Sequence, residues 1–166
     1  MRVIGIDPGS VESAYAVIDS TDCSVIEKGK LDNQDLIARL TNPDAPTIDA
    51  AGIEWIESMG MAVGASVFTT CRWVGRFEVA IEGWQPTVPV LIGRHRSKLH
   101  HCGSRKAKDA NIIQALIDRF APDKTNRGKG TKAAPGWFHG FAADVWQAYA
   151  LAVVLADQIE GREGVA

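Results

Sequence analysis

Short apolar runs separated by turn residues predict several strands, most of them early in the chain. Residues 3–6 form such a run, and an Asp-Pro-Gly-Ser sequence at residues 7–10 closes it, as is typical of a strand that ends in a tight turn. The next two runs are joined by a short polar connection, which suits an antiparallel hairpin. The strands predicted in this way cover residues 3–6, 14–19, 24–31, 48–56 and 87–93.

Helical periodicity lies between and after these runs. Residues 106–120 place apolar side chains every three or four positions, which is the period of an amphipathic helix. Asn33 is expected to cap a short helix through Leu40, and residues 62–74 and 141–158 are predicted as further helices. Hairpin strands followed by strands that alternate with helices predict an α/β protein, with a mixed five-stranded sheet flanked by helices.

Length and composition favour one globular unit. The chain has 166 residues, about the size of one domain, and we expect a single domain over residues 1–160 and a short tail at 161–166. The longest apolar run, at residues 148–156, is too short to cross a membrane. An acidic residue at position 7 is too early for a secretory signal. Three cysteines without paired spacing do not indicate a disulfide framework. A cytoplasmic protein without membrane contact is therefore expected.

The small net charge of −2 hides an uneven distribution. Residues 94–132 carry 11 Lys and Arg against 3 Asp and Glu, whereas residues 1–93 carry 6 against 13. A basic block inside an acidic chain favours local contact with a polyanion such as nucleic acid. The alternative is a solvated helix face followed by a loop. Residues 121–140, rich in Lys, Gly and Pro, are predicted as that loop, and loops of this length are usually functional or disordered.

Three acidic residues stand where chemistry can occur. Asp7 ends the first predicted strand, Glu54 lies within an apolar strand, and Asp144 shares a helix face with Ala148 and Leu151. Each also has a structural interpretation: Asp7 can cap its turn, Glu54 can face water from an edge strand, and Asp144 can cap its helix. If the three converge, their hard oxygen ligands suit Mg²⁺ or Mn²⁺. Such a centre supports phosphodiester hydrolysis.

Three sequence motifs resemble the RuvC-type Holliday junction resolvases, particularly the phage-borne members of that group. They are Ile-Gly-Ile-Asp-Pro-Gly-Ser at residues 4–10, Ile-Glu-Trp-Ile at 53–56 and Ala-Ala-Asp-Val-Trp-Gln-Ala at 142–148. The likeness covers nearly the whole chain, in the same order: hairpin strands, acidic fourth strand, basic stretch and terminal helix with its Asp. The first motif alone is weakly specific, and the ordered set is moderately so.

The resemblance implies an RNase H-like fold and a homodimer that cuts four-way DNA junctions by two symmetric nicks. It implies that Asp7, Glu54 and Asp144 are catalytic carboxylates that bind Mg²⁺, with Mn²⁺ able to substitute, and that no small-molecule cofactor is needed. The residues expected to contact DNA come from the basic stretch and the following loop: Arg94, Arg96, Lys98, Arg105, Lys106, Lys108, Lys129 and Lys132.

One position departs from the family pattern. The family usually carries a fourth ligand, Asp or His, one helical turn before the last Asp, and here that position is Phe141. We expect His139 to act instead as a ligand or proton shuttle, the alternative being a solvent-exposed loop histidine. Otherwise the site uses fewer ligands, or Asp109 or Asp118 approaches from the preceding helix.

Other functions are weighed against the resolvase. Residues 5–10 also resemble the first phosphate loop of actin-like sugar kinases and ATPases, but a second such loop is missing. A non-catalytic junction-binding protein and an RNase H-like nuclease acting on RNA remain alternatives. A zinc site at His95, His100, His101 and Cys102 lacks a second ligand pair, so a polar DNA-facing loop is expected there. Trp137 and Phe138 either stack on an unpaired base or pack over the last helix.

Overall fold

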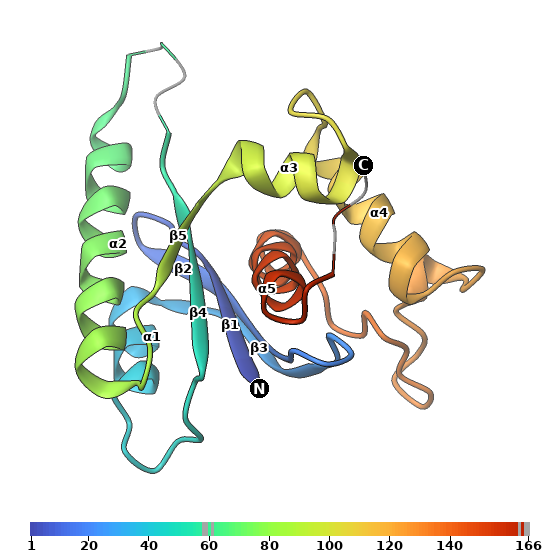
Figure 1. Cartoon of the computed structure of the whole chain (residues 1–166), viewed down its shortest axis with the longest axis horizontal. Helices are drawn as coiled ribbons and strands as arrows, with labels where there is room; N and C mark the ends of the chain where they lie inside the picture. Colours follow the sequence, from blue (N-terminus) through green and yellow to red (C-terminus); the bar gives the residue numbers. More distant parts are fainter. Residues whose placement is uncertain (58–59, 61, 163, 165–166) are drawn as a thin grey trace.

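A five-stranded mixed sheet forms the centre of the computed structural model, which describes residues 1–57, 60, 62–162 and 164 (Figure 1). Its strands are β1 (Arg2–Asp7), β2 (Glu12–Asp19), β3 (Val25–Asp32), β4 (Ala50–Trp55) and β5 (Val90–Gly93). Their order is β3-β2-β1-β4-β5. The β1–β2 and β2–β3 pairs are antiparallel, whereas β1–β4 and β4–β5 are parallel. The expected α/β class and mixed sheet are confirmed.

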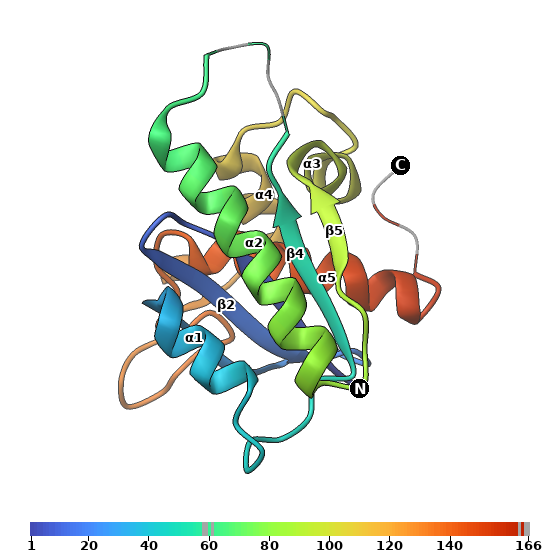
Figure 2. The ribbon, with the colours of Figure 1, turned by 90° about the vertical axis from the view of Figure 1, so that its left-hand side faces the viewer.

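Helices cover both faces of this sheet. α1 (Asn33–Leu40) and α2 (Ala65–Trp84) lie on one face, and α5 (Val145–Ile159) lies on the other (Figures 1 and 2). α3 (Arg94–Cys102) and α4 (Asp109–Phe120) pack on α5, and the short 3-10 helix η1 (Asn126–Gly128) lies in the loop before α5. None of the helices in the described part of the chain combines the length and apolar character that a membrane span needs.

The alternation of side chains along the strands creates two cores. Ile4 and Ile6 of β1 point toward α1 and α2, where they pack with Phe77. Val3 points to the other face and joins a larger cluster built mainly from α5. Because α5 is buried almost all the way round, its sequence is nearly continuous in apolar residues instead of amphipathic.

Gly5 allows α5 to lie directly on the main chain of β1. A β-carbon built at this position would lie 2.1 Å from the carbonyl oxygen of Ala148 and 2.6 Å from the amide nitrogen of Ala152. A residue without a side chain is therefore required at this point of close approach.

Replacing Gly5 with alanine is expected to lower the free energy of unfolding by about 3 kcal/mol, because α5 must move away from β1. Urea-induced unfolding measures the change. Gly75→Ala on α2 is the matched control: its added β-carbon meets nothing within 4 Å, and alanine favours a helix over glycine. A Gly5→Ala protein as stable as the wild type would contradict the close approach.

A buried carboxylate ties the far end of α5 to its neighbours. Asp157 is completely buried and accepts two hydrogen bonds from Arg119, at 2.6 and 2.7 Å. His100 Nε2 lies 2.7 Å from it, and Arg162 donates to it at 2.7 Å. Arg162 also donates to the carbonyl of Ser20. The packed structure thus extends past residue 160, where the domain was expected to end.

The helices differ most from the sequence prediction. α3 was expected to be a polar loop, and α2 continues well past Val74 because Phe77 and Ile81 also pack on the sheet. α4 and α5 begin at Asp109 and Val145, about a turn later than expected.

Asn33 does not cap α1, contrary to the prediction from the sequence. The Asp32 side chain accepts the capping bond from the amide of Gln34. Asn33 is instead buried, and it accepts a hydrogen bond from Ser13 while donating one to the carbonyl of Gly9. It therefore fastens the turn that follows β1.

Candidate active site

Two of the expected carboxylates lie side by side where two parallel strands end. β1 and β4 pair in register at Ile6 and Ile53, so that Asp7 and Glu54, the next residue of each strand, are neighbours. Ile6 and Ile53 both point into the core under α1 and α2. Since side chains alternate along a strand, both carboxylates belong to the face that carries α5.

The third carboxylate comes from the start of α5. Asp144 occupies the N-cap position, but its side chain makes no capping hydrogen bond. It accepts a hydrogen bond from Lys30 Nζ at 2.7 Å instead. The preceding Ala143 has a φ of 37°, a left-handed conformation that is uncommon for a residue with a side chain. The capping role considered from the sequence is therefore not the one that Asp144 performs.

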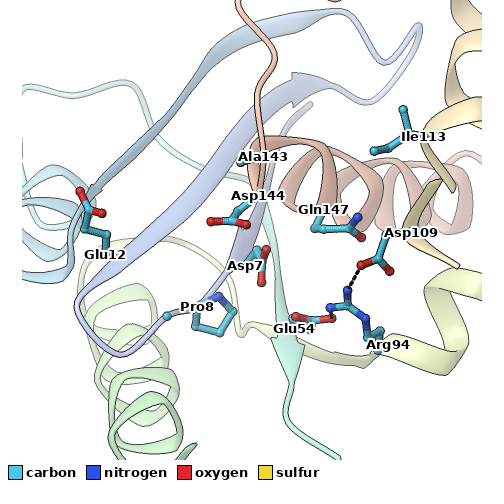
Figure 3. A pocket seen from close by; sticks show the side chains of 11 residues that line it. Asp7, Pro8, Glu12, Glu54, Arg94, Asp109, Ile113, Ala143, Asp144 and Gln147 are labelled. Atoms are coloured by element: carbon cyan, nitrogen blue, oxygen red, sulfur yellow. Dashed lines mark hydrogen bonds and ion pairs between the residues drawn. The ribbon is translucent and has the colours of Figure 1, made fainter. Parts of the chain in front are cut away.

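Asp7, Glu54 and Asp144 line one open cavity of about 510 Å³ (Figure 3). Two more acids, Glu12 and Asp109, also line it. The other lining residues are Pro8, Gly9, Arg94, Ile113, Ala143 and Gln147. With five carboxyl groups and one arginine in its wall, the cavity attracts cations.

Asp7 is strongly affected by this crowding of acids. Burial, followed by the carboxylates of Glu54 and Asp144, raises the pKa of Asp7 from 3.8 to about 8, although Arg94 opposes the shift. In the absence of an added cation, the carboxyl group is thus largely protonated near pH 7. Shifts of this size in a cleft are typical of functional sites.

Two basic side chains neutralise part of the acidic wall. Lys30 of β3 binds Asp144, and this hydrogen bond raises the pKa of Lys30. Arg94, the first residue of α3, donates to Glu54 Oε1 at 3.0 Å and to Asp109 Oδ2 at 2.5 Å. Burial opposes the charge of Arg94, but the two carboxylates outweigh it and raise its pKa.

The chemistry of the donors fits a hard divalent cation, although the side chains are not closed around one. Among the residues that the structure describes, no three acidic, histidine or cysteine side chains are grouped closely enough to hold an ion as they lie. Lys30 and Arg94 instead hold Asp144 and Glu54. Carboxylate oxygens are nevertheless the ligands that Mg²⁺ prefers, and the pKa of Asp7 is raised by burial first and then by the neighbouring carboxylates of Glu54 and Asp144.

The structure does not bring His139 to this cavity, contrary to the prediction that it is a ligand or proton shuttle. His139 is exposed, and its Nδ1 lies 3.3 Å from the carbonyl oxygen of Lys129. The reason is packing: Phe138 and Phe141 on either side of it are buried against Trp146. These anchors leave the histidine on the outside. Phe141 itself serves the core.

Of the two other acids considered for the fourth position, one reaches the site. Asp109 lines the cavity, where it accepts a hydrogen bond from Arg94. Asp118 accepts a hydrogen bond from Gln114 on the exposed side of α4 and does not line the cavity.

The expected DNA-contacting residues are all described, and of these eight Arg94 is the one that lines the cavity. The exposed members of the group are Arg96, Arg105, Lys106, Lys108 and Lys132, while Lys98 and Lys129 are partly buried. Six of the eight lie on α3 or on the connection from α3 to α4. The other two belong to the loop before α5.

Two of the three histidines of α3, His100 and His101, make structural contacts, whereas His95 is exposed and binds Glu57. His101 is buried and its Nε2 lies 3.0 Å from the carbonyl oxygen of Ala150, and burial lowers the pKa of His101 to about 4. His100 contacts Asp157.

The aromatic residues before α5 pack over that helix, which is one of the two roles considered for them. Phe138 is fully buried. Trp137 stacks on Phe120, with ring centroids 5.3 Å apart, and donates to the hydroxyl of Tyr149. Trp84, at the end of α2, is by contrast 58% exposed.

No protein-family model matches the sequence, and no curated protein does. Among solved structures, Thermus thermophilus RuvC matches with a TM-score of 0.64 and 16% identity over 99% of each chain. T. thermophilus RuvC in complex with Holliday junction substrate matches with a TM-score of 0.67 and 14% identity, again over 99% of each chain.

A viral protein also has a similar structure. The Fowlpox virus resolvase, in complex with substrate Holliday junction DNA, matches with a TM-score of 0.51 and 13% identity over 96% of this chain and 99% of that one. At such identities the likeness concerns the arrangement of the elements. The chain therefore has the RNase H-like fold of the RuvC-type Holliday junction resolvases.

Proposed function

We propose that this protein is a divalent-metal-dependent endonuclease that resolves four-way DNA junctions by paired, symmetric nicks. The observation that carries the proposal is the convergence of Asp7, Glu54 and Asp144, from three separate elements, on one open cavity. The substrate class is supported by the two similar structures that contain Holliday junction DNA.

The surroundings of the cavity support a nucleic-acid substrate. Arg96 on α3 and Arg105, Lys106 and Lys108 on the connection to α4 are exposed, and they belong to the segment between the cavity-lining Arg94 and Asp109. Lys and Arg contacts to phosphates supply affinity without reading sequence. Junction shape is therefore expected to dominate recognition, with base contacts adding preference at the cut site.

The chain provides the groups that such a reaction needs. A divalent cation bound to the carboxylates supplies a Lewis acid for the phosphate and an activated water. Asp7 and Glu54 lie at adjacent strand ends, and Asp144 lies at the N-cap of the buried helix α5. Gln147, one turn further along α5, lines the same cavity and offers an amide donor to the DNA backbone.

A cleavage assay tests the proposal. Labelled four-way junction and linear duplex of the same sequence are incubated with wild type and Glu54→Gln, with Mg²⁺ or EDTA. We expect symmetric nicks in the junction alone, lost in EDTA and in Glu54→Gln. Glu57→Gln is the matched control, since Glu57 binds His95 and does not line the cavity.

Two results would overturn the assignment. Junction binding without nicking in Mg²⁺ or Mn²⁺ would identify a non-catalytic junction-binding protein, in which the phenylalanine at position 141 marks lost chemistry. Cleavage of RNA or of an RNA–DNA hybrid, with junctions left intact, would change the substrate class.

Paired nicks require two active sites, and α2 offers a surface for a second copy of the chain. Phe68 and Val79 lie on the same side of α2 and are 64% and 71% exposed. Between α1 and α2 a groove of about 490 Å³ is lined by Ile37, Val79 and Trp84, among others. An exposed apolar helix face of this kind is typical of a homodimer interface.

Replacing Val79 with lysine is expected to convert the proposed homodimer to a monomer and to uncouple the two nicks. Light scattering coupled to size-exclusion chromatography gives the mass. Val88→Lys is the control, because Val88 is equally exposed at 71% but lies outside α2. A wild-type protein that is monomeric at micromolar concentration, alone and on junction DNA, would contradict this part of the proposal.

A further inference from the structure

Arg94 places a guanidinium among the carboxylates that the proposed function assigns to a divalent cation. Its two terminal nitrogens bind two different acids, Glu54 and Asp109 (Figure 3). The position follows from the sheet: β5 pairs with β4 so that Ile92 is opposite Glu54, and α3 begins just two residues later. Backbone register therefore brings Arg94 to Glu54.

Glu54 needs this partner as long as no other cation is bound. The residue is only 7% exposed, and an ionised carboxylate buried to that extent is costly without a paired positive charge. A divalent cation offers Glu54 a stronger partner. However, it is repelled by the guanidinium while Arg94 stays on Glu54, because the two positive charges compete for one carboxylate.

Asp109 differs from Glu54 in its surroundings. It is the first residue of α4, where the helix dipole favours a carboxylate, and its side chain is 46% exposed. Asp109 therefore binds the second terminal nitrogen of Arg94 at the exposed rim of the cavity. A planar guanidinium can give up one carboxylate and keep the other, since its donors are arranged as a fork.

We propose that Arg94 is a resident counter-ion of Glu54 that a divalent cation replaces, and that Asp109 then retains the guanidinium at the cavity rim for a DNA phosphate. Arg94 and Asp109 are thus positioning residues. The assignment of Arg94 to a DNA phosphate rests on the proposed function. The exchange on Glu54, in which a divalent cation replaces Arg94, does not.

Mn²⁺ titration of the protein without DNA tests the exchange, with free Mn²⁺ measured by electron paramagnetic resonance. Removing the competing charge in Arg94→Gln is expected to tighten Mn²⁺ binding about fivefold or more. Arg96→Gln removes the same charge from an exposed site two residues along α3, and it is expected to change the affinity less than about twofold. Equal affinity in wild type and Arg94→Gln would overturn the exchange. Thermal unfolding of each variant confirms that it is folded.

A double-mutant cycle tests the role of Asp109. Asp109→Asn leaves Arg94 to Glu54 alone, so Mn²⁺ binding is expected to weaken about fivefold in the wild-type background. In the Arg94→Gln background the same change is expected to cost less than about twofold, because no guanidinium is left to retain. If Asp109→Asn weakens Mn²⁺ binding as much in the Arg94→Gln background as in the wild-type background, Asp109 is a metal ligand. Its proposed role of retaining Arg94 would then be overturned.

Junction binding measured in Ca²⁺, with nicking suppressed, tests whether Arg94 contacts a DNA phosphate. Arg94→Gln is expected to weaken binding about tenfold and to reduce the salt dependence by about one phosphate contact. If Arg94→Gln binds the junction with the affinity and salt dependence of the wild type, the proposed phosphate contact of Arg94 is overturned. If the protein binds no junction at all, the proposed function fails, and the Mn²⁺ titrations still decide the exchange on Glu54.

Discussion

Replacing Asp7 with asparagine is expected to abolish nicking while stabilising the protein in the absence of metal. The activity loss follows because an amide cannot supply the negative charge that a divalent cation needs at the centre of the acidic wall, and we expect a fall of at least about 10³-fold in kcat. Single-turnover cleavage of a four-way junction measures it. Asp44→Asn, an exposed acid outside the cavity, is expected to cut at the wild-type rate.

The stability change has a defined pH dependence. Because the pKa of Asp7 is raised from 3.8 to about 8 in the folded protein, the folded state binds a proton that the unfolded state loses between pH 4 and pH 8. The free energy of unfolding therefore falls as pH rises through this window. Asp7→Asn removes the penalty, so that the variant is close to the wild type near pH 4 and exceeds it by several kcal/mol, up to about 5 kcal/mol, at pH 8.

Urea-induced unfolding in EDTA at pH 4 and pH 8 makes this comparison. A variant less stable than the wild type at pH 8 would show that Asp7 is a structural acid. In that case the loss of nicking would have to be attributed to misfolding, and the assignment of the acidic cavity would fall with it.

Replacing Asp157 with asparagine is expected to lower the free energy of unfolding at pH 7 by about 3–5 kcal/mol. The reason is that the change removes the charge that Arg119 and Arg162 share, and a buried ion-pair network that loses one member leaves uncompensated charge behind. Asp118→Asn, on the exposed side of α4, is the matched control and is expected to change stability by less than about 0.5 kcal/mol.

Acidification distinguishes this charged network from simple packing. Burial disfavours the charge of Asp157, but hydrogen bonds from Arg119, His100 and Arg162 outweigh burial and lower its pKa. The stability that Asp157 contributes is thus present above pH 4 and is lost as pH falls through its lowered pKa. The gap between wild type and Asp157→Asn should narrow below pH 4. A gap that is constant down to pH 2 would mean that shape, and not charge, is what Asp157 supplies.

The sequence pattern singled out Asp7, Glu54 and Asp144, three of the five acids that line the cavity, and it gave no signal for Glu12. A period of two places Asp7 and Glu54 on the face opposite their isoleucine neighbours, and the apolar residues one and two turns after Asp144 point the start of α5 toward the sheet. These are local patterns, and each is visible in one stretch of sequence. The likeness to junction resolvases then put the stretches together in the order in which the structure has them.

The features that could not be predicted depend on contacts between distant residues. α3 has a charged, histidine-rich sequence, and its buried residues are the polar Ser97 and His101, so no apolar period marks it as a helix. Arg94 was expected to contact DNA, but its position between Glu54 and Asp109 results from the β4–β5 register and the turn before α4. The prediction that His139 belongs to the site was wrong, because nothing in the local sequence shows that Phe138 and Phe141 on either side of it are core residues.

The close approach at Gly5 also bears on how far this sequence can diverge while keeping its acidic cavity. α5 meets β1 through main-chain atoms, so the separation between the strand that carries Asp7 and the helix that follows Asp144 depends little on which apolar side chains fill the rest of the core. Exchange of one aliphatic residue for another elsewhere in α5 alters local packing and leaves this separation in place. An evolutionary lineage can thus exchange many core residues while the distance between β1 and α5, and with it the spacing of Asp7 and Asp144, is kept.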